Sequence, residues 1–290
     1  KVRQISAGYM HTCAIAGVGV ATVGTLFCWG DNTQGQLGNG TTASHIEPSA
    51  VNGARSYGVV AAGQNHTCGI ASSGSTYCWG QNLTGAGTSA IPTLLPGGLH
   101  FAELADGGWQ FLCGRTLSKQ VYCWGGFPDR ALTTPTLMSG NILFDQIDVG
   151  TSHICGVTDL GALYCWGSLQ SNQVGHLVTP VSTREPLLIP TNIPFTRVVA
   201  GGLSTCGLSA TGAYCLGTTY LTGYDRPDPG PHPIPNENEH RFVTFSGAAF
   251  HTCAIDVNGG GWCWGRNVEG QLGSSNLLVP PSTPVQIFIR

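Results

Sequence analysis

The sequence is poor in charge. Asp, Glu, Lys and Arg together make up 9% of its residues, against roughly 25% in an ordinary globular protein. The formal net charge is −3, so the chain lacks the basic surface that nucleic acids require. No apolar run approaches the roughly 20 residues of a membrane-spanning helix. These absences argue against a nucleic-acid-binding protein and against direct insertion into a membrane.

Sequence patterns that carry catalysis are also missing. The 15 acidic residues are scattered, and none recurs as a facing pair suited to glycoside hydrolysis. No Gly-x-Ser-x-Gly elbow is present, and Gly17-Val18-Gly19 precedes no helical pattern that could cradle a phosphate. We therefore expect no catalytic residue, no cofactor and no enzymatic activity. The chain begins at Lys1 without a signal peptide, which predicts a mature or excised chain.

Glycine, proline and cysteine are abundant, with 43, 17 and 12 residues respectively. The cysteines fall into pairs that recur about every 48 residues, a period typical of solenoids, propellers and arrays. The pairs are Cys13/Cys28, Cys68/Cys78, Cys113/Cys123, Cys155/Cys165, Cys206/Cys215 and Cys253/Cys263. Trp-Gly follows the second member of each pair except Cys215, which precedes Leu216-Gly217. The sequence is therefore built from six repeats.

Each repeat has the pattern of four short strands. In the second repeat, an apolar run over 57–63 is followed by alternating residues over 66–70 and by a strand over 76–80. A fourth short strand lies at a proline, as in 92–95, where the missing N–H favours an edge position. Similar proline segments precede repeats two to six, and the first repeat has none before it.

The missing proline segment occurs at the other end of the chain, at Thr283–Ile289. We therefore expect Pro284 to Ile289 to pair with the first repeat, because closure of a sheet ring removes exposed edges. Four strands in each of six repeats predict an all-β, six-bladed β-propeller, closed by the C-terminal strand. Residues 1–290 would form a single domain.

An even number of regularly spaced cysteines predicts disulfides and an oxidising compartment. Within each repeat, the paired cysteines lie on neighbouring antiparallel strands, where opposed Cβ atoms are close enough to bridge. Each bond would contribute about 2–3 kcal/mol. Zinc is the alternative, but it needs four converging ligands, usually from tighter Cys-x2–4-Cys clusters. We predict one disulfide in each blade and no bound metal.

The repeat Gly-x-x-His-Thr-Cys-Ala-Ile … Cys-Trp-Gly-x-Asn-x-x-Gly-Gln-Leu-Gly resembles the regulator-of-chromosome-condensation repeat superfamily. The first and last repeats show it most clearly, at 8–15 with 28–38 and at 251–255 with 263–273. The third repeat lacks Gly-Gln-Leu-Gly. The resemblance extends over the whole chain and implies a propeller, usually one of seven blades.

The resemblance leaves several functions open, because fold does not give function. Nuclear members are nucleotide-exchange factors for a small GTPase, which does not fit six disulfides. Two extracellular branches fit better: the Crinkly-type receptor-kinase ectodomains of plants, and secreted bacterial propellers that inhibit β-lactamase. Neither branch performs catalysis with its propeller.

Histidine recurs at one repeat position, as His11, His66, His153 and His251. A ring of imidazoles could bind a metal ion, but repetition at one position is typical of packing. We expect each to hydrogen-bond to the backbone of its own blade. The Cys-Trp-Gly tryptophans likewise fit packing between blades, whereas Trp109 and Trp262 lie outside that position and are candidates for an exposed binding role.

Three N-glycosylation sequons are present, at Asn39, Asn82 and Asn65. Asn39 and Asn82 lie in expected loops, whereas Asn65 enters a core strand.

The most irregular segment is 218–241. It places proline at every second position from Pro227 to Pro235, which favours an extended arm with little entropy left to lose on binding. The residues before the prolines include typical interface anchors, and our binding candidates are Tyr220, Tyr224, Asp225 and Arg226. The alternative is a surface loop that only connects two blades. We expect Leu216, in the tryptophan position, to be buried.

The sequence favours a secreted or cell-surface recognition module that binds a protein or glycan partner through inter-blade loops. Two alternatives stay open: a structural subunit of an extracellular fibre or coat, and a secreted enzyme inhibitor. Low charge allows self-association because little like-charge repulsion opposes it.

Overall fold

The computed structural model describes residues 1–17, 23–81, 87–107, 111–127, 130–169, 173–176, 182–217, 231–234, 241–247, 251–268, 270, 272–274 and 284–287. The chain divides into two compact units, Lys1–Asn141 and Ile142–Arg290. No helix occurs among the described residues.

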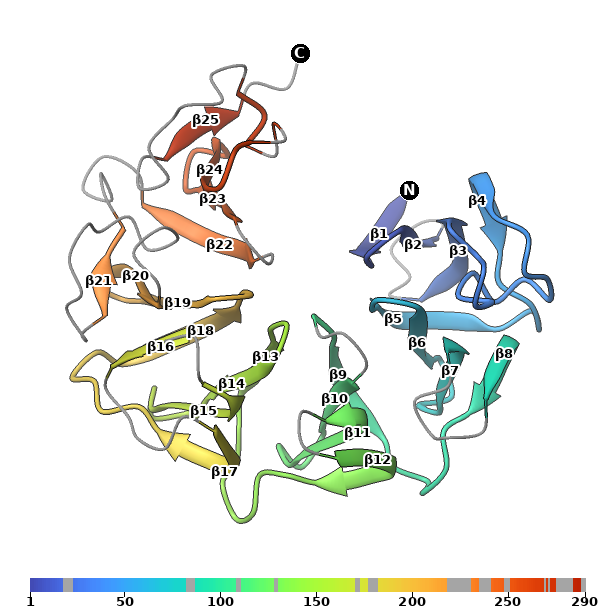
Figure 1. Cartoon of the computed structure of the whole chain (residues 1–290), viewed down its shortest axis with the longest axis horizontal. Helices are drawn as coiled ribbons and strands as arrows, with labels where there is room; N and C mark the ends of the chain where they lie inside the picture. Colours follow the sequence, from blue (N-terminus) through green and yellow to red (C-terminus); the bar gives the residue numbers. More distant parts are fainter. Residues whose placement is uncertain are drawn as a thin grey trace. The chain divides into compact units, whose positions relative to one another are not determined.

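Unit 1 contains the first three repeats as antiparallel sheets (Figure 1). Its strands are β1 (Val2–Ala7), β2 (His11–Ala16), β3 (Gly24–Gly30), β4 (His45–Ala50), β5 (Ser56–Ala62), β6 (His66–Ala71), β7 (Thr76–Gln81), β8 (Thr88–Leu94), β9 (Phe101–Ala105), β10 (Phe111–Thr116), β11 (Val121–Phe127) and β12 (Arg130–Leu137). A short bridge between β3 and β5, at Gly24 with Tyr57 and Thr25 with Ser56, joins the first two sheets.

Unit 2 repeats the same order three times. Its strands are β13 (Gln146–Val149), β14 (His153–Val157), β15 (Leu163–Ser168), β16 (Gln173–His176), β17 (Ser182–Leu188), β18 (Phe195–Ala200), β19 (Ser204–Ser209), β20 (Gly212–Gly217), β21 (His232–Pro233), β22 (Phe242–Gly247), β23 (His251–Asp256), β24 (Gly261–Gly265) and β25 (Val285–Ile287). The prediction of an all-β, six-bladed propeller with four-stranded blades is confirmed.

The C-terminal strand does not pair as expected. β25 pairs with β24, with Val285 opposite Cys263, and so forms the outer strand of the sixth blade. The first blade has its own outer strand, because β4 pairs with β3. The proline segments therefore end their own blades and do not begin the next ones. The predicted pairing with the first repeat is wrong for residues 285–287, because this segment folds back on the strand that precedes it; residues 288 and 289 lie outside the described residues.

The six predicted disulfides are confirmed. In every blade the two cysteines stand directly opposite each other on the second and third strands, with Cα atoms 4.0–4.1 Å apart. The bonds are Cys13–Cys28, Cys68–Cys78, Cys113–Cys123, Cys155–Cys165, Cys206–Cys215 and Cys253–Cys263. The chain has no free cysteine. The residue that follows the second cysteine lies at a shift of register between the third and fourth strands in several blades, for example between Cys165 and Gly167.

The disulfides are not equally covered, although the repeat gives them equivalent positions. Cys78 is only half-buried, whereas the second cysteine of every other blade is buried. It stands opposite Cys68 on β6 and opposite Thr93 on β8. Cys68 itself is fully buried in the seam with the third blade, and Cys78 packs against the margin of that cluster. The bond of the second blade is therefore closed as predicted but reaches toward the surface at Cys78.

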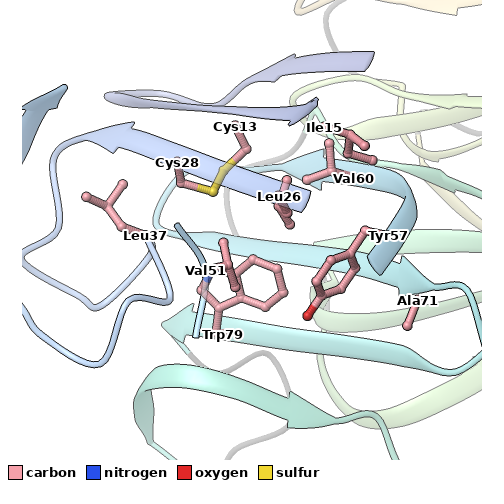
Figure 2. Packing of buried hydrophobic residues seen from close by; sticks show 10 residues of the cluster. All are labelled: Cys13, Ile15, Leu26, Cys28, Leu37, Val51, Tyr57, Val60, Ala71 and Trp79. Atoms are coloured by element: carbon pink, nitrogen blue, oxygen red, sulfur yellow. A yellow bond between two sulfur atoms is a disulfide. The ribbon is translucent and has the colours of Figure 1, made fainter. Parts of the chain in front are cut away.

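Within each unit, the first strand of one blade covers the disulfide face of the blade before it. Tyr57 and Val60 of β5 pack with Ile15 and the Cys13–Cys28 disulfide of the first blade (Figure 2). The same arrangement places Phe101 and Leu104 on Cys68 and Ile70, Phe195 and Val198 on Cys155 and Val157, and Phe242 on Cys206 and Leu208. In a seam with two such buried side chains, they contribute roughly 3–6 kcal/mol.

Leu216 is buried, as predicted, with an exposed fraction of 2%. It packs with Phe195 and Val198 in the seam between the fourth and fifth blades. A smaller aliphatic side chain thus fills the place that tryptophan takes in the other blades. The arm expected to follow it lies mostly outside the described residues.

Glycine after the first cysteine makes room for the aromatic ring at the start of the blade. A Cβ at Gly156 would lie 2.6 Å from the ring of Phe144. That ring packs between Tyr164 and Trp166 of the same blade, with centroid distances of 5.9 and 5.6 Å. The first blade has Val2 in place of the aromatic residue, and Ala14 there replaces the glycine. In the first and fourth blades, the residues at these two positions are therefore matched in size.

Candidate recognition loops

The described residues contain no group of three or more His, Cys, Asp and Glu side chains that could hold a metal ion. Two ion pairs are present among them, His66 with Asp106 and Arg115 with Glu103. No helix in the described part of the chain is long and apolar enough to cross a membrane.

Three of the four repeated histidines, His11, His66 and His153, lie in seams between blades of the same unit. His11 Nε2 is 2.8 Å from Thr67 Oγ1 of the next blade, and His153 Nε2 is 2.9 Å from Thr205 Oγ1. The Thr67 hydroxyl donates its proton to the carbonyl oxygen of Gln36 at 2.8 Å. Because a hydroxyl has one proton, His11 must donate through Nε2. The expectation that each histidine bonds to backbone in its own blade is wrong for these two.

The histidine of the second blade has a different partner, because the third blade lacks the threonine. In the third blade, Leu112 takes the position of Thr67 and offers no hydroxyl. His66 of the second blade instead bonds to Asp106, 2.5 Å away, with both side chains buried. Histidine therefore links neighbouring blades through whichever polar group the next blade provides.

Burial keeps His11 and His153 neutral at neutral pH. It lowers the pKa of His153 to about 4. Burial, together with the nearby His66, also lowers the pKa of His11 to about 4 against a smaller opposing effect of Asp31. A neutral imidazole with one donor and one acceptor suits a structural role in the seam better than a catalytic one.

The loop between β1 and β2 combines a fixed backbone with exposed side chains. Gly8 N donates to His11 O at 2.8 Å, and Tyr9 N donates to Gly63 O of the second blade at 3.1 Å. Met10 O accepts from Asp31 N at 2.8 Å. The side chains of Tyr9 and Met10 are nevertheless 75% and 64% exposed. The loop therefore presents two large side chains on a backbone that three hydrogen bonds hold in place.

Asp31 adjoins this loop through its backbone, because its N–H donates to Met10 O at 2.8 Å. Burial alone would raise the pKa of Asp31, but hydrogen bonds from Thr33, Gln36 and Ser44 outweigh it and lower the pKa. Asp31 is therefore ionised at neutral pH. The backbone bond from Asp31 to Met10 thus joins a negatively charged residue to the loop that carries the exposed Tyr9 and Met10.

The same backbone frame recurs with other side chains. Gln81 N donates to Asn65 O at 2.7 Å in the second blade, and Ser168 N donates to Ser152 O at 2.8 Å in the fourth. Thr151 N donates to Gly201 O at 3.3 Å, as Tyr9 does to Gly63. A constant frame with variable side chains is the usual arrangement of a recognition surface.

Most predicted binding residues lie outside the described residues: Trp109, Tyr220, Tyr224, Asp225, Arg226 and the sequon residue Asn82. Trp262 is described and is partly buried. Its indole N–H donates to Asp256 at 2.9 Å, and Asp256 also accepts from Asn258 N and Gly260 N. Trp262 therefore fixes the β23–β24 turn. A binding role for it stays a prediction.

The two described sequon residues are part of hydrogen-bonded structure. Asn39 Oδ1 accepts from Thr41 N and Thr41 Oγ1, at 3.1 and 2.9 Å, and Asn39 Nδ2 donates to Ser49 Oγ at 3.2 Å. Asn65 Nδ2 lies 3.4 Å from Gln81 Oε1. Both side chains are half-buried. Glycosylation of either remains a prediction.

Sequence reasoning missed Tyr9 and Met10. One signal was available, because Trp109, chosen for exposure, follows the glycines of the third repeat as Tyr9 follows Gly8. Alignment of the loops between the first and second strands would have placed these residues at one position.

Family models for the regulator of chromosome condensation (RCC1) repeat match residues 23–70, 60–85 and 144–175. The human E3 ubiquitin-protein ligase HERC2 is 35% identical over 69 residues, as is the mouse protein. The match spans 23% of this chain and 1% of the length of each relative.

Solved structures with the same fold cover the chain almost completely. Human WBSCR16 has a TM-score of 0.84 at 18% identity and is matched over 100% of this chain and 82% of its own. Yeast RCC1 (Prp20), in its structure bound to Kap60, has a TM-score of 0.82 at 20% identity, over 100% and 75%. The Crinkly ectodomain of the Arabidopsis thaliana receptor kinase ACR4 has a TM-score of 0.59 at 21% identity, over 92% and 83%. The chain is therefore a propeller with one disulfide in every blade, and its segments 23–85 and 144–175 match the RCC1 repeat.

Proposed function

We propose that the chain is a non-catalytic recognition module that binds a protein partner through the loops between the first and second strands of its blades. The observation that carries this proposal is the Tyr9–Met10 pair, exposed on a backbone held by hydrogen bonds at both ends. Tyrosine is a frequent interface anchor, and a fixed loop loses little entropy on binding. Asp31, whose backbone bonds to this loop, is ionised and favours a partner that carries Lys or Arg beside an apolar pocket.

An extracellular or otherwise oxidising location fits this role. Six disulfides would not persist in a reducing cytosol. The ACR4 structure is described as an ectodomain, which supports the same location. Yeast Prp20 is described as bound to Kap60 and as having binding properties to Gsp1p and histones. RCC1-like propellers thus bind proteins, and we extend that property, without those partners, to this chain.

The proline-rich arm is the second part of the proposed surface. Tyr220, Tyr224 and Arg226 remain candidate anchors on the ground of their sequence alone. Roles as a fibre subunit or as an enzyme inhibitor would use the same loops. Native mass spectrometry separates them, because it reports a polymer, a monomer or a complex with an enzyme.

The test compares the parent chain with the double variant Tyr9→Ser, Met10→Ser. Each protein is used to capture partners from the extracellular fluid of its source, and captured proteins are quantified by mass spectrometry. We expect the double variant to capture at least tenfold less of one protein than the parent chain does, and to keep the parent's melting temperature. The control is Leu117→Ser, which is 77% exposed in the β10–β11 turn and lies outside these loops. Unchanged capture, or turnover of a glycoside, ester or peptide by the purified chain, contradicts the proposal.

A further inference from the structure

The disulfide of the second blade is the least covered of the three in unit 1. Cys78 is only half-buried, whereas all four cysteines of the first and third blades are 0% exposed. The third blade gives the closest comparison, because Cys113 and Cys123 are also 10 residues apart and also stand directly opposite each other on neighbouring strands. The two bonds therefore close loops of the same length and differ in how well they are covered.

The second blade lacks an aliphatic side chain that covers the bond in other blades. Nine positions after the second cysteine, the other blades have a buried aliphatic residue wherever this position is described: Leu37, Leu132, Val174 and Leu272. Leu37 packs in one cluster with the Cys13–Cys28 disulfide, and Figure 2 shows it beside Cys28. The second blade has Gly87 at this position, and a Cβ there would meet no atom within 4 Å. The partial exposure of Cys78 thus accompanies the loss of this side chain.

The residue opposite Cys78 does not replace the missing cover. Thr93 on β8 pairs with Cys78, and directly opposed side chains lie on the same face of a sheet. Thr93 is exposed, and its hydroxyl lies 3.2 Å from Ser89 Oγ. In the fourth blade the equivalent residue is Leu187, which packs against the cluster that contains Cys165. A small polar side chain therefore stands where a larger apolar one shields the fourth disulfide.

The two sulfur atoms of the second blade differ in access. Cys68 is 0% exposed and packs with Phe101 and Leu104 in the seam with the third blade. Access decides which sulfur of a disulfide an external thiolate attacks, so the attack falls on Cys78 and Cys68 becomes the leaving group. A free cysteine is well tolerated in apolar surroundings. The seam can therefore stay packed when the bond opens.

We propose that Cys78 is a site of reversible thiol–disulfide exchange with a low-molecular-weight thiol. The thiolate of the small molecule attacks Cys78 Sγ and forms a mixed disulfide there, while the sulfur of Cys68 leaves as a thiolate and takes a proton from water. Attack of the Cys68 thiolate on Cys78 Sγ expels the small thiol and restores the original bond. The site does not include the loops of the proposed recognition surface, so its failure would leave the proposed function standing.

The test uses the full chain with its six disulfides intact and reduced glutathione as the probe. The protein is incubated with excess glutathione in native buffer, quenched with acid, alkylated, and mapped by mass spectrometry without reduction. We expect glutathione on Cys78, and we expect the Cys68–Cys78 bond to open at least tenfold faster than Cys113–Cys123. Circular dichroism should show a native fold throughout.

A matched pair of variants tests the route of access. Thr93→Leu places the residue of the fourth blade opposite Cys78 and should slow its exchange at least threefold. The control is Thr136→Leu, the same change opposite Cys123, which should leave exchange at Cys78 unchanged. Both variants should keep the parent melting temperature, and the comparison of the two bonds in the parent needs neither of them.

Four results would overturn the proposal. Equal rates for the two bonds would show that cover does not decide exchange, and simultaneous opening of all three bonds of unit 1 would show that global unfolding exposes them. Absence of glutathione from Cys78 would exclude it as the attacked sulfur. Exchange that Thr93→Leu leaves unchanged would show that the open face beside Cys78 is not the route.

Discussion

Acidification should weaken the seams that contain His11 and His153. Each imidazole is buried and neutral, and each shares a hydrogen bond with a threonine hydroxyl of the next blade. The unfolded chain binds a proton to each histidine near pH 6.5, whereas in the folded chain the pKa is about 4. The stability that the neutral form provides is thus fully present above pH 6.5 and is lost as the pH falls toward 4.

The magnitude follows from the two pKa values. For a group with a pKa of about 4 when folded and 6.5 when unfolded, linkage gives a loss of about 2 kcal/mol between pH 7 and pH 5. His11 belongs to unit 1 and His153 to unit 2, so each unit should lose about this amount. Below pH 4 both states are protonated, and the loss from these groups ends.

The assay is urea unfolding at pH 7 and pH 5, followed by tryptophan fluorescence. His153→Gln keeps a donor toward Thr205 but cannot titrate. It should reduce the difference between the two pH values by about 2 kcal/mol. Carboxylates such as Asp31 change the stability of the parent and of the variant by the same amount between the two pH values, so their contribution cancels in the comparison. The control is His45→Gln at an exposed site on β4, which should retain the parental difference. If His153→Gln also retains it, the assignment of the pH dependence to this seam is refuted.

Three other changes test the packing. Gly156→Ala forces a Cβ against the Phe144 ring, and we expect a loss of about 1–3 kcal/mol in chemical denaturation; a loss below about 0.5 kcal/mol would contradict the size matching. Replacing both Cys113 and Cys123 by Ser opens a short loop and should cost about 3 kcal/mol; an unchanged unfolding midpoint would show that the bond constrains nothing. Deletion of 284–290 removes β25, and hydrogen exchange should then accelerate in β24 before it does in β3; equal acceleration in both would contradict the observed pairing.

The sequence predicts the length and number of the repeats, but not the residue at which each blade begins and ends. Paired cysteines and Cys-Trp-Gly repeat at a constant interval, so the number of blades and the disulfides follow directly. A proline segment between two repeats, however, belongs equally well to the end of one blade or to the start of the next. The choice depends on whether β4 reaches β3, which is a contact in space. The error about Pro284–Ile289 has this origin.

The sequence also could not predict which residues of neighbouring repeats contact each other. His11 and Thr67 lie in different blades, and no sequence pattern at either position indicates that the two side chains form a hydrogen bond. The threonines at Thr67 and Thr205 follow the repeated histidine position, but their partners appear only once the seams are known. Exposure of Tyr9 is likewise a property of the folded loop, since the same residue type is buried as Tyr57.

The spacing of the disulfides has a consequence for how the chain is made. The bonded cysteines are 9–15 residues apart, and every blade takes its strands from one stretch of chain. A sulfur atom can thus meet its partner soon after both have been synthesised, before the next repeat presents a competing thiol. Oxidation can proceed in the order of translation, and each completed blade offers an apolar face on which the next blade forms. A secretory cell would need little disulfide isomerisation to produce this protein, despite its twelve cysteines.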